Sequence, residues 1–219
     1  MVGEVTTSET PSPVLIGMRA PDFEASTTQG KVSLSQFKGK WVVLFSHPAD
    51  FTPVCTTEFI SFTQKYDEFK RRNVQLIGLS VDSVPSHIAW VMNIKEKMGI
   101  DVPFPIIADL HKDVSRKYGM IHSSVESDVT VRSVFFIDPE HILRAIIYYP
   151  KSTGRNMDEI LRVIDSLQLV DKEKIATPAN WKPGDPVVMP PPGTVQSAMD
   201  RLKEGCECKD WYYCTKRIE

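Results

Sequence analysis

The sequence of 219 residues lacks several features that would point to common classes of binding protein. Its formal net charge is only −2, so it has no charge excess that favours nucleic acid or an anionic membrane surface. Its apolar runs stay well short of the roughly 18 residues that cross a bilayer. Its N-terminus has neither a basic start nor an apolar stretch, which predicts no signal peptide and a cytoplasmic location. We therefore expect neither a nucleic-acid nor a membrane partner.

Cysteine is also scarce. The four cysteines stand as one isolated residue, Cys55, and a late group of Cys206, Cys208 and Cys214. In an intracellular chain this favours catalytic, redox or metal-binding thiols over a structural disulfide set. Zinc is the rival interpretation of the late group, but no histidine follows His141 and the spacing is not the paired Cys-x-x-Cys of common zinc sites. We therefore predict no metal and no cofactor.

The remaining composition is ordinary for one globular domain with an extension, with 42% hydrophobic and 25% charged residues. Apolar runs and amphipathic stretches alternate along the chain. They predict strands at 41–46, 74–81, 105–108, 134–138 and 142–149, and helices at 53–72, 85–98, 113–118 and 157–169. Helices between the early strands, followed by a late hairpin, predict an α/β fold with a mixed sheet flanked by helices.

The composition changes after about residue 170. Six prolines lie between positions 178 and 193, which excludes a regular helix or a central strand and predicts an extended surface segment. A short helix is expected at 195–203, and the aromatic residues around it are expected to dock on another surface. We divide the chain into an N-terminal arm (1–13), a main domain (14–170) and a C-terminal extension (171–219).

Cys55 stands between a predicted buried strand and a predicted helix. Thr52 is a natural N-cap and Pro53 a natural first helical residue, which places Cys55 near the third helical position. The unpaired N–H groups and the positive end of the helix dipole favour a thiolate there. A small buried core cysteine is the alternative, and placement alone leaves both interpretations open.

A motif of the form Pro-x-x-x-Thr-x-x-Cys is complete at Pro48, Thr52 and Cys55. It resembles the active-site motif of the peroxiredoxins, which are thiol-dependent peroxidases with a thioredoxin-like fold. The opening segment 17–23 looks like that of the same family, and the segment 131–138 looks like the family's strand that carries the active-site arginine. Residues 149–162 are similar to its long-tailed branch, often called one-cysteine peroxiredoxins, and the cysteine-bearing end looks like the archaeal thioredoxin peroxidases of that branch.

The resemblance implies an enzyme that reduces hydrogen peroxide and organic hydroperoxides to water and alcohols. Cys55 is then the peroxidatic nucleophile and passes through a sulfenic acid. The Thr52 hydroxyl would reach both thiolate and peroxide, and Pro48 would wall the pocket against water. Arg132 would be the active-site cation that binds substrate and stabilises charge. Taken without the resemblance, these three residues are a plain N-cap, a turn proline and a solvated strand arginine.

Three further residues are assigned on the resemblance, each with a structural alternative. Arg155 lies in a Gly-Arg-Asn turn that in this branch reaches the same pocket and contributes to substrate binding; otherwise it is a helix-start arginine. Glu58 is expected to hold the two arginines, and otherwise is a charge in the first helical turn. His47 is expected to be a hydrogen-bonding neighbour of the cysteine, and otherwise a structural histidine.

The resemblance also implies how the Cys55 thiolate is regenerated from the sulfenic acid. Cys214 matches the resolving cysteine of the archaeal group and Cys208 its companion, while Cys206 departs from that pattern and is treated as accessory. The extension would act as a dimerisation segment that crosses to the partner subunit, so that the disulfide Cys55–Cys214 is intermolecular and Cys208 takes it over as Cys208–Cys214. A thioredoxin-like dithiol donor would reduce it. The implied assembly is a homodimer, often five dimers in a homodecamer ring.

A second class of function would use the same residues. In a redox sensor or holdase, oxidation or assembly changes partner binding and turnover is incidental. A resolving thiol favours turnover, whereas a sensor can stop at the sulfenic or sulfinic state.

Overall fold

The computed structural model describes residues 13–125, 127–202 and 207–218. The predicted N-terminal arm, apart from Pro13, and Cys206 lie outside the described residues. The chain forms two compact units, which meet in sequence between Arg155 and Asn156. The predicted division of the chain at residue 170 stays a prediction.

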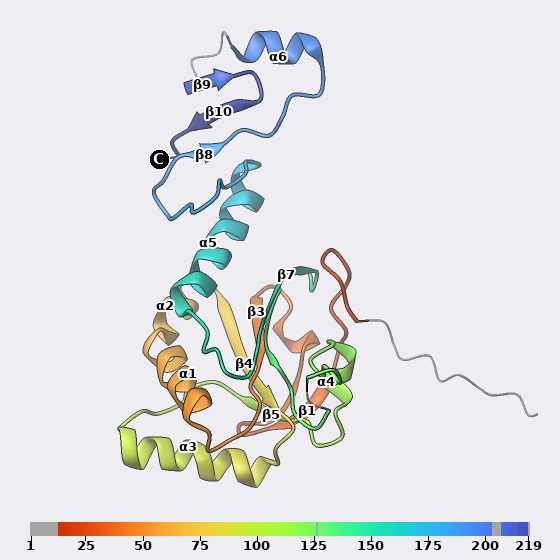
Figure 1. Ribbon diagram of the computed structural model, residues 1–219, viewed down its shortest axis with the longest axis vertical. Coiled ribbons are helices and arrows are strands. Elements are labelled where there is room, and N and C mark those ends of the chain that lie inside the picture. Colours follow the sequence, from red (N-terminus) through yellow and green to blue (C-terminus); the bar gives the residue numbers. More distant parts are fainter. Residues whose placement is uncertain (1–12, 126, 203–206, 219) are drawn as a thin grey trace, which may run out of the picture. The chain divides into compact units, whose positions relative to one another are not determined.

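The first unit is built on a seven-stranded mixed sheet with the order β2-β1-β5-β4-β3-β6-β7 (Figure 1). Its strands are β1 (Glu24–Thr27), β2 (Gly30–Ser33), β3 (Trp41–Ser46), β4 (Val74–Ser80), β5 (Ile106–Ala108), β6 (Arg132–Ile137) and β7 (Leu143–Tyr149). The neighbours β3, β4 and β5 run parallel, and the other pairs are antiparallel. The predicted α/β fold with a mixed sheet and a late hairpin is confirmed.

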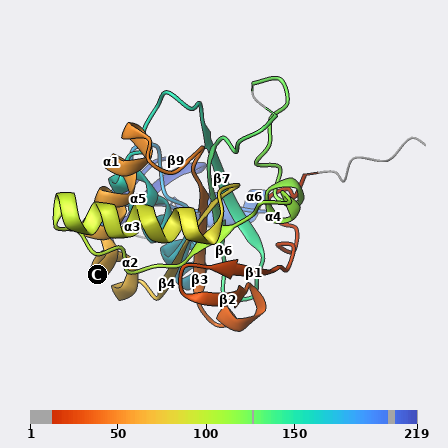
Figure 2. The same cartoon turned by 90° about the horizontal axis from the view of Figure 1, so that it is seen from below.

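The described part of this unit has four α-helices, α1 (Pro53–Gln64), α2 (Tyr66–Arg71), α3 (Val84–Met98) and α4 (Asp113–Lys117), and a short 3-10 turn at Ser35–Phe37. In both views α1 and α2 lie on one side of the sheet and α4 on the other (Figures 1 and 2). The predicted single helix over 53–72 is wrong, because the backbone of Lys65 (φ −95°, ψ 4°) leaves the helical range and separates α1 from α2. Within the described residues every helix is too short or too polar to span a lipid bilayer.

The central strands form the core of the sheet. β3 and β6 are buried along their whole length, which explains their nearly continuous apolar sequences. Gly78 of β4 lies under α1, and a Cβ added there would stand 3.3 Å from the Phe59 ring and 3.4 Å from the Phe45 ring. The glycine therefore lets the Phe59 side of α1 approach the sheet closely.

The second unit contains α5 (Met157–Glu173), α6 (Val195–Arg201) and a small sheet of β8 (Val187–Val188), β9 (Glu207–Asp210) and β10 (Tyr213–Lys216). Asn156 caps the start of α5 with its side chain, and Lys174 in the left-handed region (φ 51°) ends it. The proline-rich segment contributes only the two-residue edge strand β8. A small core forms around Ile175, Trp181 and Val187.

Candidate active site

Cys55 lies in the first turn of α1. The helix begins at Pro53 after the extended N-cap residue Thr52, so Cys55 occupies the predicted third helical position. Its side chain is fully buried and is not part of a disulfide. Cys55 therefore has the feature on which each interpretation depends: it is buried like a core cysteine, and it stands at a helix start like a reactive one.

Arg132 brings a positive charge to this sulfur. Its Nη1 lies 3.4 Å from Cys55 Sγ and 2.7 Å from Glu58 Oε2, and its Nε donates to the Lys151 carbonyl oxygen at 2.9 Å. The arginine is 2% exposed. It is a buried cation beside the cysteine and not a solvated strand residue.

Glu58 joins Arg132 to a second buried arginine, Arg155. The Arg155 N–H and Nε donate to Glu58 Oε1 at 2.9 Å each, and Arg155 Nη2 donates to Oε2. Burial alone would raise the pKa of the Glu58 carboxyl, but the charge and hydrogen bonds of Arg155, followed by the charge of Arg132, hold this pKa below its usual value. Arg155 Nη1 donates to the carbonyl oxygens of Ser46 and Ser133, at 2.9 and 3.0 Å.

The charges of this cluster suit a thiolate. Two guanidinium groups and one carboxylate leave a single net positive charge, which a negative sulfur at Cys55 would balance. The hydrogen bonds of Arg155 go to Glu58 and to backbone carbonyl oxygens, so Arg155 holds the cluster together without contacting the sulfur. Of the two arginines, Arg132 is the one that touches Cys55.

We predict that Glu58→Gln lowers the free energy of unfolding by about 3–5 kcal/mol at neutral pH, because it leaves two buried guanidinium groups without their shared carboxylate. A carboxyl whose pKa is depressed by folding stabilises the native state above its usual pKa of 4.5, and this contribution is lost as the pH falls through the lowered pKa. Protonated Glu58 has nearly the shape of glutamine, so urea unfolding curves of the two proteins should converge in acid. A difference that does not change with pH would contradict this role.

Thr52 and Pro48 belong to the loop between β3 and α1. Thr52 is the N-cap residue by backbone geometry, but its hydroxyl does not cap the helix and donates instead to the Ala49 carbonyl oxygen at 2.9 Å. With its hydrogen used in this way, Oγ1 has its lone pairs left to accept a hydrogen bond. Pro48 is buried.

His47 does not bind Cys55 as expected. Its Nε2 lies 2.9 Å from Asp50 Oδ1, while its Nδ1 is buried and without a partner among the described residues. Burial lowers the pKa of the His47 imidazole. The ring is therefore neutral, and Asp50 determines its orientation.

Asp50 also contacts a second buried histidine, His87 of α3. Burial would raise the pKa of Asp50, but hydrogen bonds from His47 and His87 hold it well below its usual range, so the carboxylate only accepts. His87 faces this carboxylate with Nδ1 at 2.8 Å and the Ile107 carbonyl oxygen with Nε2 at 3.1 Å. The buried contact between His87 and Asp50 ties α3 to the loop before Cys55.

The three side chains of this histidine–aspartate cluster also have the types and spacing of a metal site. Their ligand atoms all lie within 4.8 Å of one another. The histidine nitrogens that face Asp50 are already hydrogen-bonded to its carboxylate, while His47 Nδ1 is without a partner among the described residues. Sequence reasoning missed Asp50 and His87. Asp50 stands inside the motif, but no sequence signal connects it to a histidine on α3.

The late cysteines lie in the C-terminal unit. Cys208 of β9 and Cys214 of β10 form a disulfide across the small sheet. In this oxidised state Cys208 and Cys214 offer no thiolate to a zinc ion.

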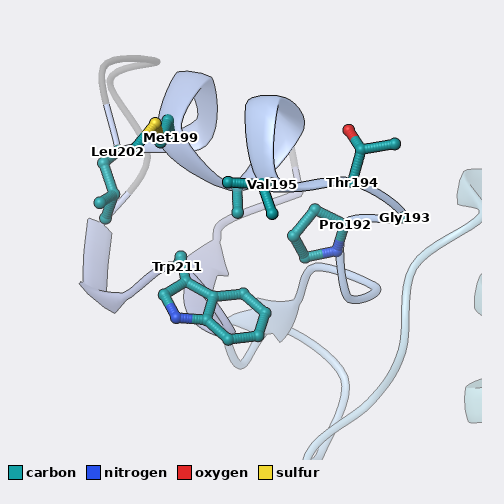
Figure 3. A pocket seen from close by; sticks show the side chains of 8 residues that line it. Pro192, Gly193, Thr194, Val195, Met199, Leu202 and Trp211 are labelled. Carbon is teal, nitrogen blue, oxygen red and sulfur yellow. The ribbon is translucent and has the colours of Figure 1, made fainter.

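The C-terminal unit also contains an apolar pocket of about 570 Å³, lined on one side by α6 and on the other by the Trp211 ring (Figure 3). Its lining residues are Pro192, Gly193, Thr194, Val195, Ala198, Met199, Leu202 and Trp211. These side chains include no acid, base or thiol. The pocket is therefore an apolar surface and not a second chemical site.

A free cysteine at a helix start, with a guanidinium beside its sulfur, and a C-terminal unit that carries a disulfide define a cysteine-dependent redox enzyme. The AhpC/TSA family model matches residues 16–146, and the model of the C-terminal domain of 1-Cys peroxiredoxin matches residues 166–205. The chain belongs to the AhpC/TSA family, the peroxiredoxins, and is a thiol-dependent peroxidase with a thioredoxin-like fold.

Individual relatives resemble it over almost their whole length. A peroxiredoxin of Aquifex aeolicus is 58% identical over 214 residues, covering 93% of this chain and 96% of the relative. Peroxiredoxin 2 of Picrophilus torridus is 55% identical over 204 residues, covering 93% and 100%. Among solved structures, a yeast mitochondrial 1-Cys peroxiredoxin has a TM-score of 0.83 at 45% identity, covering 94% of this chain and 100% of its own. A mutant of peroxiredoxin 6 of Arenicola marina has a TM-score of 0.82 at 40% identity, covering 94% and 99%.

Proposed function

We propose that Cys55 is the peroxidatic nucleophile and that Arg132 is the cation that assists it. The observation that carries this proposal is the 3.4 Å contact between Arg132 Nη1 and the free, buried Sγ of Cys55. The thiolate attacks one peroxide oxygen and the O–O bond breaks. The second oxygen leaves as hydroxide or alkoxide and takes a proton to become water or alcohol, while Cys55 becomes a sulfenic acid. Arg132 stabilises the negative charge on the sulfur and then on the departing oxygen.

Thr52 orients the peroxide and Pro48 keeps water from the sulfur. The Thr52 hydroxyl gives its hydrogen to the Ala49 carbonyl, so its oxygen is available to accept the peroxide O–H. Pro48, four residues earlier in the same loop, is buried and offers no N–H to water. Because Cys55 has no exposed surface, peroxide enters through a local opening of the surrounding side chains.

Arg155, Glu58 and His47 support this chemistry without touching the sulfur. Glu58 orients Arg132 through the 2.7 Å hydrogen bond, and Arg155 adds positive charge that favours substrate binding. His47 holds the active-site loop through Asp50.

The recycling steps use the late cysteines. Cys214 of a partner subunit attacks the sulfenic acid, releases water and forms the disulfide Cys55–Cys214, which Cys208 takes over as Cys208–Cys214. The presence of a Cys208–Cys214 disulfide in the C-terminal unit supports this order. A thioredoxin-like dithiol protein reduces it; the yeast relative is described with glutathione and thioredoxin systems for thiol resolution. We further propose a cytoplasmic homodimer that assembles into a decamer, with Cys206 accessory.

A disulfide map after one equivalent of peroxide tests this proposal. Wild type and the variants Cys206→Ser, Cys208→Ser and Cys214→Ser are compared on a non-reducing gel. We expect a dimer-sized species that is lost only in Cys214→Ser, and that persists longer in Cys208→Ser because the take-over step is blocked. Loss of the species in Cys206→Ser instead would show that Cys206 is the resolving thiol.

A further inference from the structure

The disulfide between Cys208 and Cys214 joins an edge strand to a central strand. The small sheet has the order β8-β10-β9, and Cys214 of β10 stands directly opposite Cys208 of β9. On its other side β10 pairs with β8, and the Cys214 carbonyl oxygen accepts a hydrogen bond from the Met189 N–H at 3.0 Å. Backbone therefore flanks Cys214 on both sides, whereas within the small sheet Cys208 has a neighbouring strand on one side only.

The two cysteines also differ in exposure. Cys214 is 1% exposed, while Cys208 is partly exposed. In thiol–disulfide exchange the incoming thiolate approaches the attacked sulfur along the S–S axis, from the side opposite the leaving sulfur, so access decides which sulfur reacts. For Cys208 this approach starts outside the edge strand. For Cys214 it passes over β8.

We propose that the reducing donor attacks Cys208 and that Cys214 is the leaving thiol. The donor thiolate bonds to Cys208 Sγ while the Cys208–Cys214 bond breaks, and the electron pair of that bond leaves on Cys214 as a thiolate. The donor's second thiol loses its proton and attacks the donor sulfur of the mixed disulfide. The donor is thereby oxidised to a disulfide, Cys208 leaves as a thiolate, and the two thiolates take up two protons.

This order rests on the proposed recycling by a dithiol donor and adds a direction to it. Cys214, the proposed resolving thiol, is freed in the first step while the donor is still attached to Cys208. Cys208 is therefore the point at which electrons enter the chain.

A donor trap tests the order on the full chain carrying Cys206→Ser, oxidised to the Cys208–Cys214 disulfide. The donor is a thioredoxin whose second active-site cysteine is replaced by serine, so that the mixed disulfide persists. Samples are stopped with acid at early times and alkylated. Trypsin cuts after Lys203 and Lys209, which places Cys208 and Cys214 in different peptides. We expect at least a ~10-fold excess of donor on the Cys208 peptide, with Cys214 alkylated.

Glutathione is the small-molecule control for thioredoxin, because its reaction depends on access to the Cys208 and Cys214 sulfurs and not on docking of a protein donor. Its adduct should favour Cys208 in the folded chain and lose this preference in denaturing urea, where both sulfurs are open. Equal adducts in the folded chain, or thioredoxin mainly on Cys214, would overturn the inference and leave recycling by thioredoxin intact. Absence of any thioredoxin adduct, with peroxide reduction still supported by dithiothreitol, would overturn both the inference and the donor class, but not the peroxidase activity.

Discussion

Replacing Cys55 by serine should reduce peroxide consumption by the purified protein to the rate seen in buffer alone. A serine hydroxyl is not ionised at neutral pH and is a far weaker nucleophile than a thiolate, and an alcohol has no counterpart to the sulfenic acid. The hydroxyl can still accept the hydrogen bond from Arg132 Nη1, so the buried arginine keeps a partner at this position. Peroxide loss is measured in a single-turnover assay, with thermal unfolding as the check on the fold.

Cys214→Ser is the matched control for this prediction, because it also removes one thiol but leaves Cys55, Arg132 and Glu58 unchanged. It should consume the first equivalent of peroxide as fast as wild type and then stop, since the sulfenic acid has no resolving partner. If Cys55→Ser continues to consume peroxide while Cys214→Ser does not, the nucleophile lies among the late cysteines.

The strands and helices that could be predicted from the sequence are those with strong apolar patterns. β3, β4 and β6 are buried on both faces and therefore read as continuous apolar runs. The hairpins β1–β2 and β9–β10 are not predicted, since segments such as EAST (24–27) and ECKD (207–210) are only four residues long and contain no large apolar side chain. Pairing across a sheet, not local sequence preference, makes them strands.

The active site likewise has features that local sequence predicts and features that depend on how the chain folds. The position of Cys55 on α1 follows from a capping pattern within four residues, so local rules were sufficient. The contact of Glu58 with Arg155 joins positions 97 residues apart, and that of Asp50 with His87 joins positions 37 apart. Such contacts depend on how the helices pack on the sheet. The resemblance supplied Arg132 and Arg155, but only the fold distinguishes the arginine that touches the sulfur from the one that holds Glu58.

Replacing Arg132 by methionine should lower the second-order rate constant of Cys55 with hydrogen peroxide by about 100-fold or more, the usual cost of losing one charge-assisted donor at a reacting oxygen. The variant should fold, because Glu58 keeps its hydrogen bonds to Arg155 and the methionine fills much of the buried volume. Arg132→Lys is the matched control. It retains the charge but loses the planar geometry, so its rate should fall between those of wild type and methionine variant.

The alkylation rate of Cys55, measured on the same variants, separates the two effects that we assign to Arg132: stabilising the thiolate and stabilising the departing oxygen. Alkylation of Cys55 by iodoacetamide depends on the thiolate but has no departing oxygen, so it reports only the effect of the guanidinium on the sulfur. Within the described residues Arg132 Nη1 is engaged with Glu58 and Cys55, and Nη2 makes no hydrogen bond, so its N–H groups are available to the departing oxygen. We therefore expect the methionine variant to lose more of its peroxide rate than of its alkylation rate. Equal losses would limit Arg132 to stabilising the thiolate, and an unchanged peroxide rate in the folded variant would remove it from the mechanism.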